Sequence, residues 1–365
     1  MRRRTALIGA VLAAVAGVIV ALIVVVGGDD EKTGQQPVGR AIALDTDDDG
    51  RSVALVEQLD RDLHRAAVAR VDRNGSLEVS DVALPVDHPA AMAVDDAGAV
   101  IVTGARLVDG ERRLAVARVT AGGEVDRSFG TGGVATGEAG TGDAIARGIA
   151  VSARGGIVVV ADAADGDRHA MAIARIGRTG RLASVDLIGD ASAAAVAADR
   201  DGDVVAAGTD TRSGSAVIAR LRDARSPAVT RGERFAGATW RAIATSPDAG
   251  VIVVGSARED TKRGVVAVQR FGSGDRPARA EIVAVGQGDG YGVAVEFGPD
   301  GGVVIGANGS EGDAPAAYVV KRLADRAPSG VGRRRAPGRV AGVTPNGGVL
   351  TTHWDGERQM AAFIR

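Results

Sequence analysis

Residues 91–104 read AMAVDDAGAVIVTG: a short apolar run, a turn containing aspartate and glycine, and a second apolar run ending in glycine. The pair Met92-Ala93 near its start, a bulky aliphatic residue followed by alanine, has six counterparts along the chain. They are Ile42-Ala43, Ile149-Ala150, Val196-Ala197, Ile243-Ala244, Val293-Ala294 and Val340-Ala341. Successive pairs stand 50, 57, 47, 47, 50 and 47 residues apart. A repeat of this length with strand-turn-strand content is typical of propellers and arrays.

Each unit contains further strand signals after the first two. In the second unit, residues 114–119 form another apolar run, and a weaker one surrounds Val134 after a glycine turn. Four short apolar runs joined by Gly and Asp turns indicate four strands per unit. Runs that are apolar on both faces fit strands packed between neighbouring sheets. The sequence therefore predicts an all-β fold, a seven-bladed β-propeller with four-stranded blades, over residues 36–365.

The recurring alanine has a physical reason in such a ring. The first strand of each blade would lie nearest the axis, where the sheets converge and small side chains let them approach. The last unit stops at residues 360–365, which correspond to a third strand. We expect Gln36-Pro37-Val38 to supply the missing fourth strand and close the ring, because closure removes exposed sheet edges.

The amino terminus has the pattern of a membrane segment. Arg2, Arg3 and Arg4 precede an uncharged stretch from Thr5 to Gly28. This is longer than the roughly 20 residues that span a bilayer as a helix. We expect residues 1–28 to form a basic tip and a transmembrane helix, with residues 29–35 as a polar linker. The arginines favour a cytoplasmic tip and a propeller outside the cell. Cleavage after Ala14-Val15-Ala16, giving a secreted protein, is the alternative.

Bulk composition narrows the function classes. The net charge is −2 and no cysteine is present among the 365 residues. The small net charge disfavours nucleic acid as a main partner. The absence of cysteine excludes disulfides, thiolate zinc sites and cysteine nucleophiles. Aromatic residues make up 2% of the chain, too few to favour the aromatic platforms of carbohydrate binding.

One junction between units carries a more specific pattern. Residues 117–119 read ARV and residues 123–134 read GEVDRSFGTGGV. This stretch resembles the delta-60 repeat family, whose units run from an apolar-Ala-Arg strand to Ser-Phe-Gly-Thr-Gly-Gly. The other units share only the hairpin and the strand that ends in arginine. The resemblance implies a bacterial exported propeller-like domain, and it carries over no catalytic residue.

The third strand of every unit ends in arginine, and these residues are the first candidate site. They are Arg70, Arg118, Arg175, Arg220, Arg270, Arg322 and Arg365. A ring of guanidinium groups is suited to anions or an acidic partner, with Arg118, Arg175 and Arg220 as the named candidates. The alternative is a structural role, in which each guanidinium pairs with a turn aspartate or a carbonyl.

The second candidate site is acidic. Asp45, Asp47 and Asp49 precede Gly50 at alternating positions, the spacing at which calcium loops place oxygen ligands. The twelfth position of such a loop is Val56 rather than glutamate, so an EF-hand does not fit. A plain Asp-Gly hairpin turn is the alternative. Calcium is the one cofactor that the sequence suggests.

These features favour a membrane-anchored extracytoplasmic propeller, expected as a monomer, that binds a protein or cell-envelope partner without catalysis. The alternative is a metal-dependent hydrolase of the lactonase type, with carboxylates at the central channel. Only the scattered residues Asp95, Asp199 and Glu296 occupy suitable places for that chemistry. Neither histidine pairs nor a Gly-x-Ser-x-Gly elbow support another catalytic constellation.

Overall fold

The computed structural model describes residues 20–21, 38–46, 52–60, 63–71, 77–199, 201–222, 226–235, 237–246, 248, 250–259, 263–285, 289–297, 302–311, 314–322, 332–337, 339–343, 349–354 and 359–364. All regular structure in this part of the chain is β-strand. The strands form seven antiparallel sheets within the described ranges, which we number in chain order. Every sheet keeps its strands in sequence order, so each is a simple meander.

The strand bounds follow the unit boundaries seen in the sequence. Sheet 1 contains β1 (Val20–Ala21), β2 (Val38–Thr46), β3 (Ser52–Asp60), β4 (Leu63–Val71) and β5 (Leu77–Val82). Sheet 2 contains β6 (Asp87–Val94), β7 (Val100–Val108), β8 (Glu111–Val119) and β9 (Val134–Gly137). Sheet 3 contains β10 (Ile145–Val151), β11 (Ile157–Asp165), β12 (Arg168–Ile176) and β13 (Leu182–Gly189).

The second half of the chain repeats this plan. Sheet 4 contains β14 (Ala191–Ala198), β15 (Val204–Asp210), β16 (Ala216–Leu221) and β17 (Ala228–Arg231). Sheet 5 contains β18 (Thr239–Thr245), β19 (Val251–Glu259), β20 (Arg263–Phe271) and β21 (Glu281–Val283). Sheet 6 contains β22 (Tyr291–Phe297), β23 (Val303–Glu311), β24 (Ala314–Arg322) and β25 (Gly332–Pro337). Sheet 7 contains β26 (Arg339–Val343), β27 (Val349–Trp354) and β28 (Gln359–Ile364).

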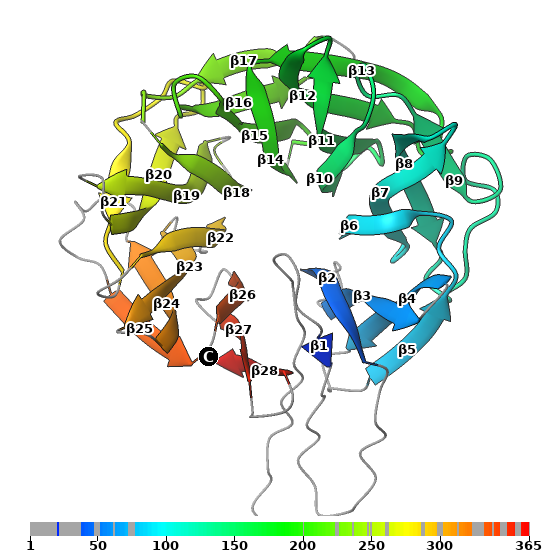
Figure 1. The fold of residues 1–365 in the computed structure, drawn as a ribbon, viewed down its shortest axis with the longest axis horizontal. Coiled ribbons are helices and arrows are strands. Elements are labelled where there is room, and N and C mark those ends of the chain that lie inside the picture. The colour runs from blue at the N-terminus through cyan, green and yellow to red at the C-terminus, as the bar shows by residue number, and fades with distance from the viewer. Residues whose placement is uncertain are drawn as a thin grey trace, which may run out of the picture.

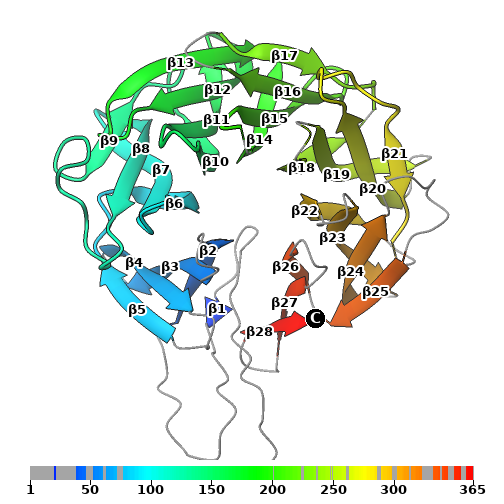
Figure 2. The ribbon, with the colours of Figure 1, turned by 180° about the vertical axis from the view of Figure 1, so that it is seen from behind.

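The sheets stand side by side around a common centre (Figure 1). The first long strand of each, from β2 and β6 to β26, lies nearest that centre, and the later strands lie progressively further out. The view from behind shows the same radial order (Figure 2), with sheet 7 beside sheet 1. The expectation of an all-β fold built from four-stranded antiparallel sheets is confirmed.

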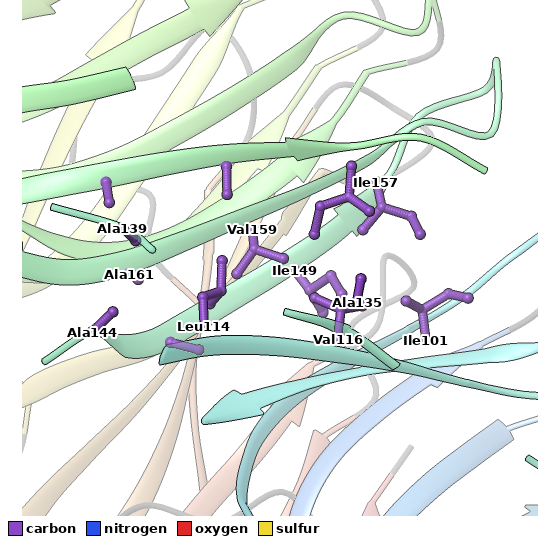
Figure 3. Packing of buried hydrophobic residues seen from close by; sticks show 14 of the residues in the cluster. Ile101, Leu114, Val116, Ala135, Ala139, Ala144, Ile149, Ile157, Val159 and Ala161 are labelled. Atoms are coloured by element: carbon purple, nitrogen blue, oxygen red, sulfur yellow. The ribbon is translucent and has the colours of Figure 1, made fainter. Parts of the chain in front are cut away.

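The aliphatic-alanine pairs divide their side chains between two cores. Ile149 of β10 packs against sheet 2 in one cluster, together with Ile101 and Val116, as Figure 3 shows. Ala150, the next residue, belongs to the cluster that sheet 3 forms with sheet 4. Successive side chains on a strand point to opposite faces, so one pair serves both neighbours. The smaller residue faces the next sheet and the bulkier one faces the preceding sheet.

The register shifts, as at a β-bulge, within the innermost long strand of each of the seven sheets. In sheets 2 to 6 a glycine or alanine of the next strand lies at this shift: Gly104, Ala161, Gly208, Gly255 and Gly306. In sheet 5 the register shifts between Trp240 and Ala242, and Gly255 pairs with Trp240. A Cβ at Gly255 would overlap the Thr239 carbonyl oxygen and lie 2.7 Å from the Trp240 Cα. The bulge brings the two backbones too close for a side chain, so this position requires glycine.

Polar side chains also tie neighbouring sheets together near the centre. The Trp240 N–H donates to Thr209 Oγ1 of sheet 4 at 3.0 Å. The Ala193 N–H donates to Asp162 Oδ1 of sheet 3 at 2.7 Å, an equivalent bond one sheet earlier. A bulged strand leaves backbone groups unpaired within its own sheet, and these bonds satisfy them from the neighbouring sheet.

Ring closure differs from the expectation. Val38 belongs to β2 and pairs with Ala21 of β1, so Val38 is not part of the last sheet. Gln36 and Pro37 lie outside the described residues. Sheet 7 has three strands among the residues that the structure describes.

Within the segment expected to span a membrane, only Val20 and Ala21 are described, and they form strand β1 rather than helix. The rest of residues 1–28, and all of the linker at 29–35, lie outside the described residues. The described residues contain no helix that is long and apolar enough to cross a bilayer.

Candidate functional site

The arginines that end the third strands contact specific partners. Arg118 of β8 donates from Nη2 to Asp95 Oδ2 at 2.7 Å, and its Nε lies 3.8 Å from Asp126 Oδ2. Arg175 of β12 bonds Ser184 at 3.0 Å and forms an ion pair with Asp186, both in the adjacent strand β13. Both guanidinium groups are thus neutralised by their own sheet.

Arg220 of β16 connects two sheets. Its Nη1 donates to Asp199 Oδ2 of its own sheet at 3.2 Å, and its Nε donates to Asp275 Oδ1 of sheet 5 at 2.9 Å. The Arg220 side chain has 0% exposed surface. The Arg220 guanidinium is enclosed between two carboxylates, which agrees with the structural role that the sequence left open.

Two aspartates considered for metal chemistry organise turns instead. Asp95 Oδ1 accepts the N–H groups of Ala97 and Ala99 at 3.0 and 2.9 Å. Asp199 Oδ1 accepts the N–H groups of Asp201 and Asp203 at the same distances. The second oxygen of each carboxylate binds the arginine of the same sheet, as described above. Each aspartate therefore fixes a hairpin turn and a third-strand arginine together.

A cavity opens beside Arg118, between sheets 2 and 3. Its volume is about 430 Å³. Residues of the β6–β7, β10–β11 and β12–β13 turns line it, together with apolar side chains beneath them. They are Asp95, Asp96, Ala97, Ile101, Arg118, Val151, Gly155, Ile157 and Arg178. We name the side of the ring that carries turns 95–99, 152–156 and 199–203 the inner-turn face, and the cavity lies on it.

The cavity has a polar rim and an apolar floor. Ile101, Val151 and Ile157 supply the floor, from one strand of sheet 2 and two of sheet 3. Arg178 is exposed. Its guanidinium lies so close to Gly155 that a Cβ added to Gly155 would overlap the guanidinium. Gly155 has φ +73°, which favours glycine as well. Arg178 occupies no recurring position, and Gly155 is a recurring turn glycine equivalent to Gly98 and Gly202, so the sequence alone distinguished neither residue.

The motif at residues 128–133 fills the outer part of the same boundary. Phe129 is 1% exposed and belongs to the core between sheets 2 and 3. The Gly130 N–H donates to the Thr179 carbonyl of sheet 3 at 2.8 Å. The stretch that resembles the delta-60 family therefore packs one unit onto the next.

The acidic turn after β2 is only partly described. Asp45 Oδ2 accepts the Val94 N–H of sheet 2 at 2.9 Å, a contact between the first two sheets. Asp47 and Asp49 lie outside the described residues. The described part of the chain contains no group of three or more His, Cys, Asp or Glu side chains that could hold a metal. Calcium binding at residues 45–49 stays a prediction.

Glu296 of β22 and Asp45 of β2 are acidic residues on innermost strands. Burial, together with the nearby charge of Asp45, raises the pKa of Glu296 to about 7. The Glu296 side chain is exposed to solvent, and protein atoms also lie close around its carboxylate. Both are expected for a side chain on an innermost strand beside the central opening. Solvent contact limits the effect of the surrounding protein on the carboxylate charge.

Comparison with known proteins adds information on the fold alone. No family model matches the sequence. No curated protein matches it either. A streptogramin B lyase structure is 12% identical with a TM-score of 0.53, and the match covers 86% of this chain and 91% of that one.

Two further structures give similar values. A Dos1 propeller is 11% identical with a TM-score of 0.54, over 90% of this chain and 84% of that one. An ulvan lyase of polysaccharide lyase family PL25 is 8% identical with a TM-score of 0.55, over 87% and 90% of the two chains. At these identities the likeness is one of fold, and it supports a β-propeller architecture for this chain.

Proposed function

We propose that this protein is a membrane-anchored, extracytoplasmic propeller of seven blades, one per sheet, that binds a protein or cell-envelope partner without catalysing a reaction. The observation that carries the proposal is the cavity between sheets 2 and 3 on the inner-turn face. Concave sites with an apolar floor and a few polar groups are where proteins usually bind ligands. The resemblance of residues 123–134 to the delta-60 repeat family supports an exported domain.

The rigidity of the ring supports the same role. Arg220 and Asp275 join sheets 4 and 5, and Thr209 and Trp240 join them again nearer the centre. Turns held by such contacts keep a fixed spacing between neighbouring sheets. A partner that contacts several turns then loses little conformational freedom of the propeller on binding, and this favours affinity.

A photo-cross-linking residue in place of Asp96 tests the binding role. Asp96 is exposed at the cavity, and the full chain would be irradiated in intact cells. The same residue in place of Asp167 is the matched control, because Asp167 is exposed at the β11–β12 turn on the opposite face. A specific adduct from position 96 alone supports the proposal. No adduct, or the same adducts from both positions, contradicts it.

The anchor at residues 1–28 needs a separate test, for which the absence of cysteine in the sequence is an advantage. Asp167→Cys and Arg2→Cys would each introduce a single thiol. A maleimide that cannot cross membranes should label position 167 in intact cells and position 2 only after lysis. Recovery of the protein from the medium would instead favour cleavage and secretion.

A metal-dependent hydrolase with its site at the central opening is the second candidate. The observation favouring it is that the Asp45 and Glu296 carboxylates lie near each other, and that burial together with the Asp45 charge raises the pKa of Glu296. A hydrolase of this kind needs a divalent ion held by convergent oxygen ligands. Stoichiometric binding of Ca²⁺, Mn²⁺ or Zn²⁺ by the full chain, lost in Glu296→Gln, would support this candidate over the binding module.

A further inference from the structure

The turns after the third strands of sheets 3 and 5 have the same backbone geometry but different residues at one position. In sheet 5, Gly272 N–H donates to the Arg276 carbonyl and Asp275 N–H donates to the Gly272 carbonyl, at 3.0 and 2.8 Å. In sheet 3, Gly177, Gly180 and Arg181 make the corresponding bonds at 2.8 and 2.9 Å. Asp275 has φ 56° and Gly180 has φ 81°. The two residues therefore occupy equivalent places.

This difference changes how the boundary with the preceding sheet is filled. Between sheets 4 and 5, the Asp275 carboxylate accepts from Arg220 and both groups are buried. Between sheets 2 and 3, the equivalent residue Gly180 has no carboxylate to offer to Arg118. A Cβ at Gly180 would lie 2.8 Å from the Gly130 Cα, so the 128–133 loop prevents a side chain there. The inner part of this boundary remains open as the cavity of about 430 Å³.

A second cation faces the same cavity. Arg178, in the β12–β13 turn, lines the cavity with an exposed guanidinium. Among the described residues its side chain makes no hydrogen bond or ion pair, whereas Arg118 is paired with Asp95. Gly155 allows the Arg178 guanidinium to lie against the β10–β11 turn, which restricts where it points. The cavity thus offers a guanidinium without a direct partner, that of Arg178, beside an apolar floor, and the Asp96 carboxylate lies on the same rim.

We propose that this cavity binds a small monocarboxylate with a short apolar body, held through Arg178. The ligand carboxylate pairs with Arg178 and not with Arg118, whose charge Asp95 and Asp126 already neutralise. A guanidinium matches a carboxylate with two parallel hydrogen bonds, and Ile101, Val151 and Ile157 receive the apolar part. The exposed carboxylate of Asp96 at the rim disfavours polyanions. The inference rests on the proposed binding role of the inner-turn face and names its ligand class.

Pentanoate is a suitable probe. Pentan-1-ol and pentylamine carry the same apolar chain and serve as the uncharged and the cationic control ligand. Ligand-observed NMR titration of the full chain in lipid nanodiscs, with empty nanodiscs as the blank, measures the affinities. We expect pentanoate to bind at least about tenfold more tightly than either analogue, because only it pairs with Arg178. Equal affinities, or no pentanoate binding at concentrations up to about 10 mM, would overturn the proposal.

Variants then locate the site. Arg178→Ala should weaken pentanoate binding about tenfold, since it removes a charge-assisted pair. Arg181→Ala is the matched control: it removes an exposed arginine of the same turn that does not line the cavity, and affinity should stay within about twofold. Equal effects of the two variants would contradict the assignment, because general electrostatic attraction would then explain binding. The denaturation midpoint of each variant confirms folding.

The outcome also separates this inference from the proposed function. If position 96 cross-links a partner while pentanoate does not bind, the binding role stands and the monocarboxylate class is wrong. If pentanoate binds through Arg178 and position 96 gives no adduct, the cavity is a small-molecule site and the macromolecular partner is wrong.

Discussion

The guanidinium of Arg220 bonds the carboxylate of Asp275 across the boundary between sheets 4 and 5, with Nε 2.9 Å from Oδ1 and 3.1 Å from Oδ2. The Arg220 side chain has no exposed surface and that of Asp275 is 11% exposed. A buried pair of this kind adds little beyond well-packed apolar residues. Removing the Asp275 charge leaves Arg220 paired with Asp199 alone, and its Nε and Nη2 groups lose their charged acceptor. Its value is geometric, since it fixes how two sheets meet.

Asp275→Asn tests this contact. Asparagine tolerates the positive φ of this position, so the variant removes the charge and keeps the turn. We expect a loss of about 1–3 kcal/mol in the free energy of unfolding, measured by urea denaturation, because buried N–H groups of Arg220 lose a charged acceptor. Asp203→Asn is the control, because its partner Arg222 is 58% exposed and such pairs contribute under about 1 kcal/mol. Similar losses in both variants would show that burial does not govern the effect.

Gly255→Ala tests the close approach at the bulge of β18. The added Cβ meets backbone atoms of Thr239 and Trp240, which cannot move aside as a flexible side chain can. We expect a destabilisation of about 1–3 kcal/mol. Gly272→Ala, where a Cβ meets nothing within 4 Å, should change stability by less than about 0.5 kcal/mol. The idea fails if the two alanines are tolerated equally well.

Phe129→Ala tests the role of the 128–133 motif. Phe129 is buried between sheets 2 and 3, and its loss leaves a cavity that backbone relaxation fills only in part. We expect about 3–5 kcal/mol of destabilisation in urea denaturation. Ser128→Ala removes an exposed residue whose hydrogen bonds stay within its own loop, so its effect should be much smaller. A mild effect of Phe129→Ala would mean that the motif serves something other than packing.

The lowered pKa of Asp210 predicts that the protein loses stability in acid. Burial alone would raise its pKa, but hydrogen bonds from Ser213, Arg231 and Arg212 outweigh burial and lower the pKa to about 2. Since the folded pKa lies below the ordinary value of 3.8, this contribution is present above pH 3.8 and is lost as the pH falls towards 2.

Thermal unfolding between pH 2 and 6 measures this effect. Asp210→Asn should be less stable than wild type at pH 6, and the difference should shrink towards pH 2. Asp167→Asn, an exposed turn variant, is the control and should follow wild type throughout. A pH-independent gap between Asp210→Asn and wild type would argue against ionisation as the cause.

The raised pKa of Glu296 predicts that stability changes with pH in the opposite direction. Its pKa in the folded protein is about 7, above the ordinary value of 4.5, so the folded state holds a proton that the unfolded state has released in this interval. Stability should therefore fall as the pH rises from 4.5 to 7. Glu296→Gln should abolish that decline in a thermal unfolding series, and a variant that declines like wild type would contradict the shift.

Several features of the fold follow from local sequence. The alternation of Ile149 and Ala150 predicts one bulky and one small side chain on opposite faces of a strand, and the structure places them in the cores on either side of sheet 3. Turn aspartates such as Asp95 and Asp199 have a local signal as well, since both precede a glycine by a few residues. Strand positions and turns depend mainly on neighbours in the chain, so periodicity predicts them.

The candidate site was less accessible to such reasoning. The pairing of Arg118 with a turn aspartate was one of two open readings, and only the fold shows that Arg118 and Arg220, at equivalent places, meet different neighbours. Aligning the turns at Gly180 and Asp275 is the one sequence signal that could have indicated the difference. Arg178 had no signal, because its role depends on Gly155 in another turn.

The amino-acid sequence by itself determined the repeat, the antiparallel strands and the small residues near the centre, because these follow from side-chain size and from the two-residue period of a strand. The tertiary structure alone decided which boundaries between sheets are closed by an ion pair and which stays open. Contacts between residues about fifty positions apart set that difference, as for Arg220 and Asp275, and a local pattern does not encode the distance between their side chains.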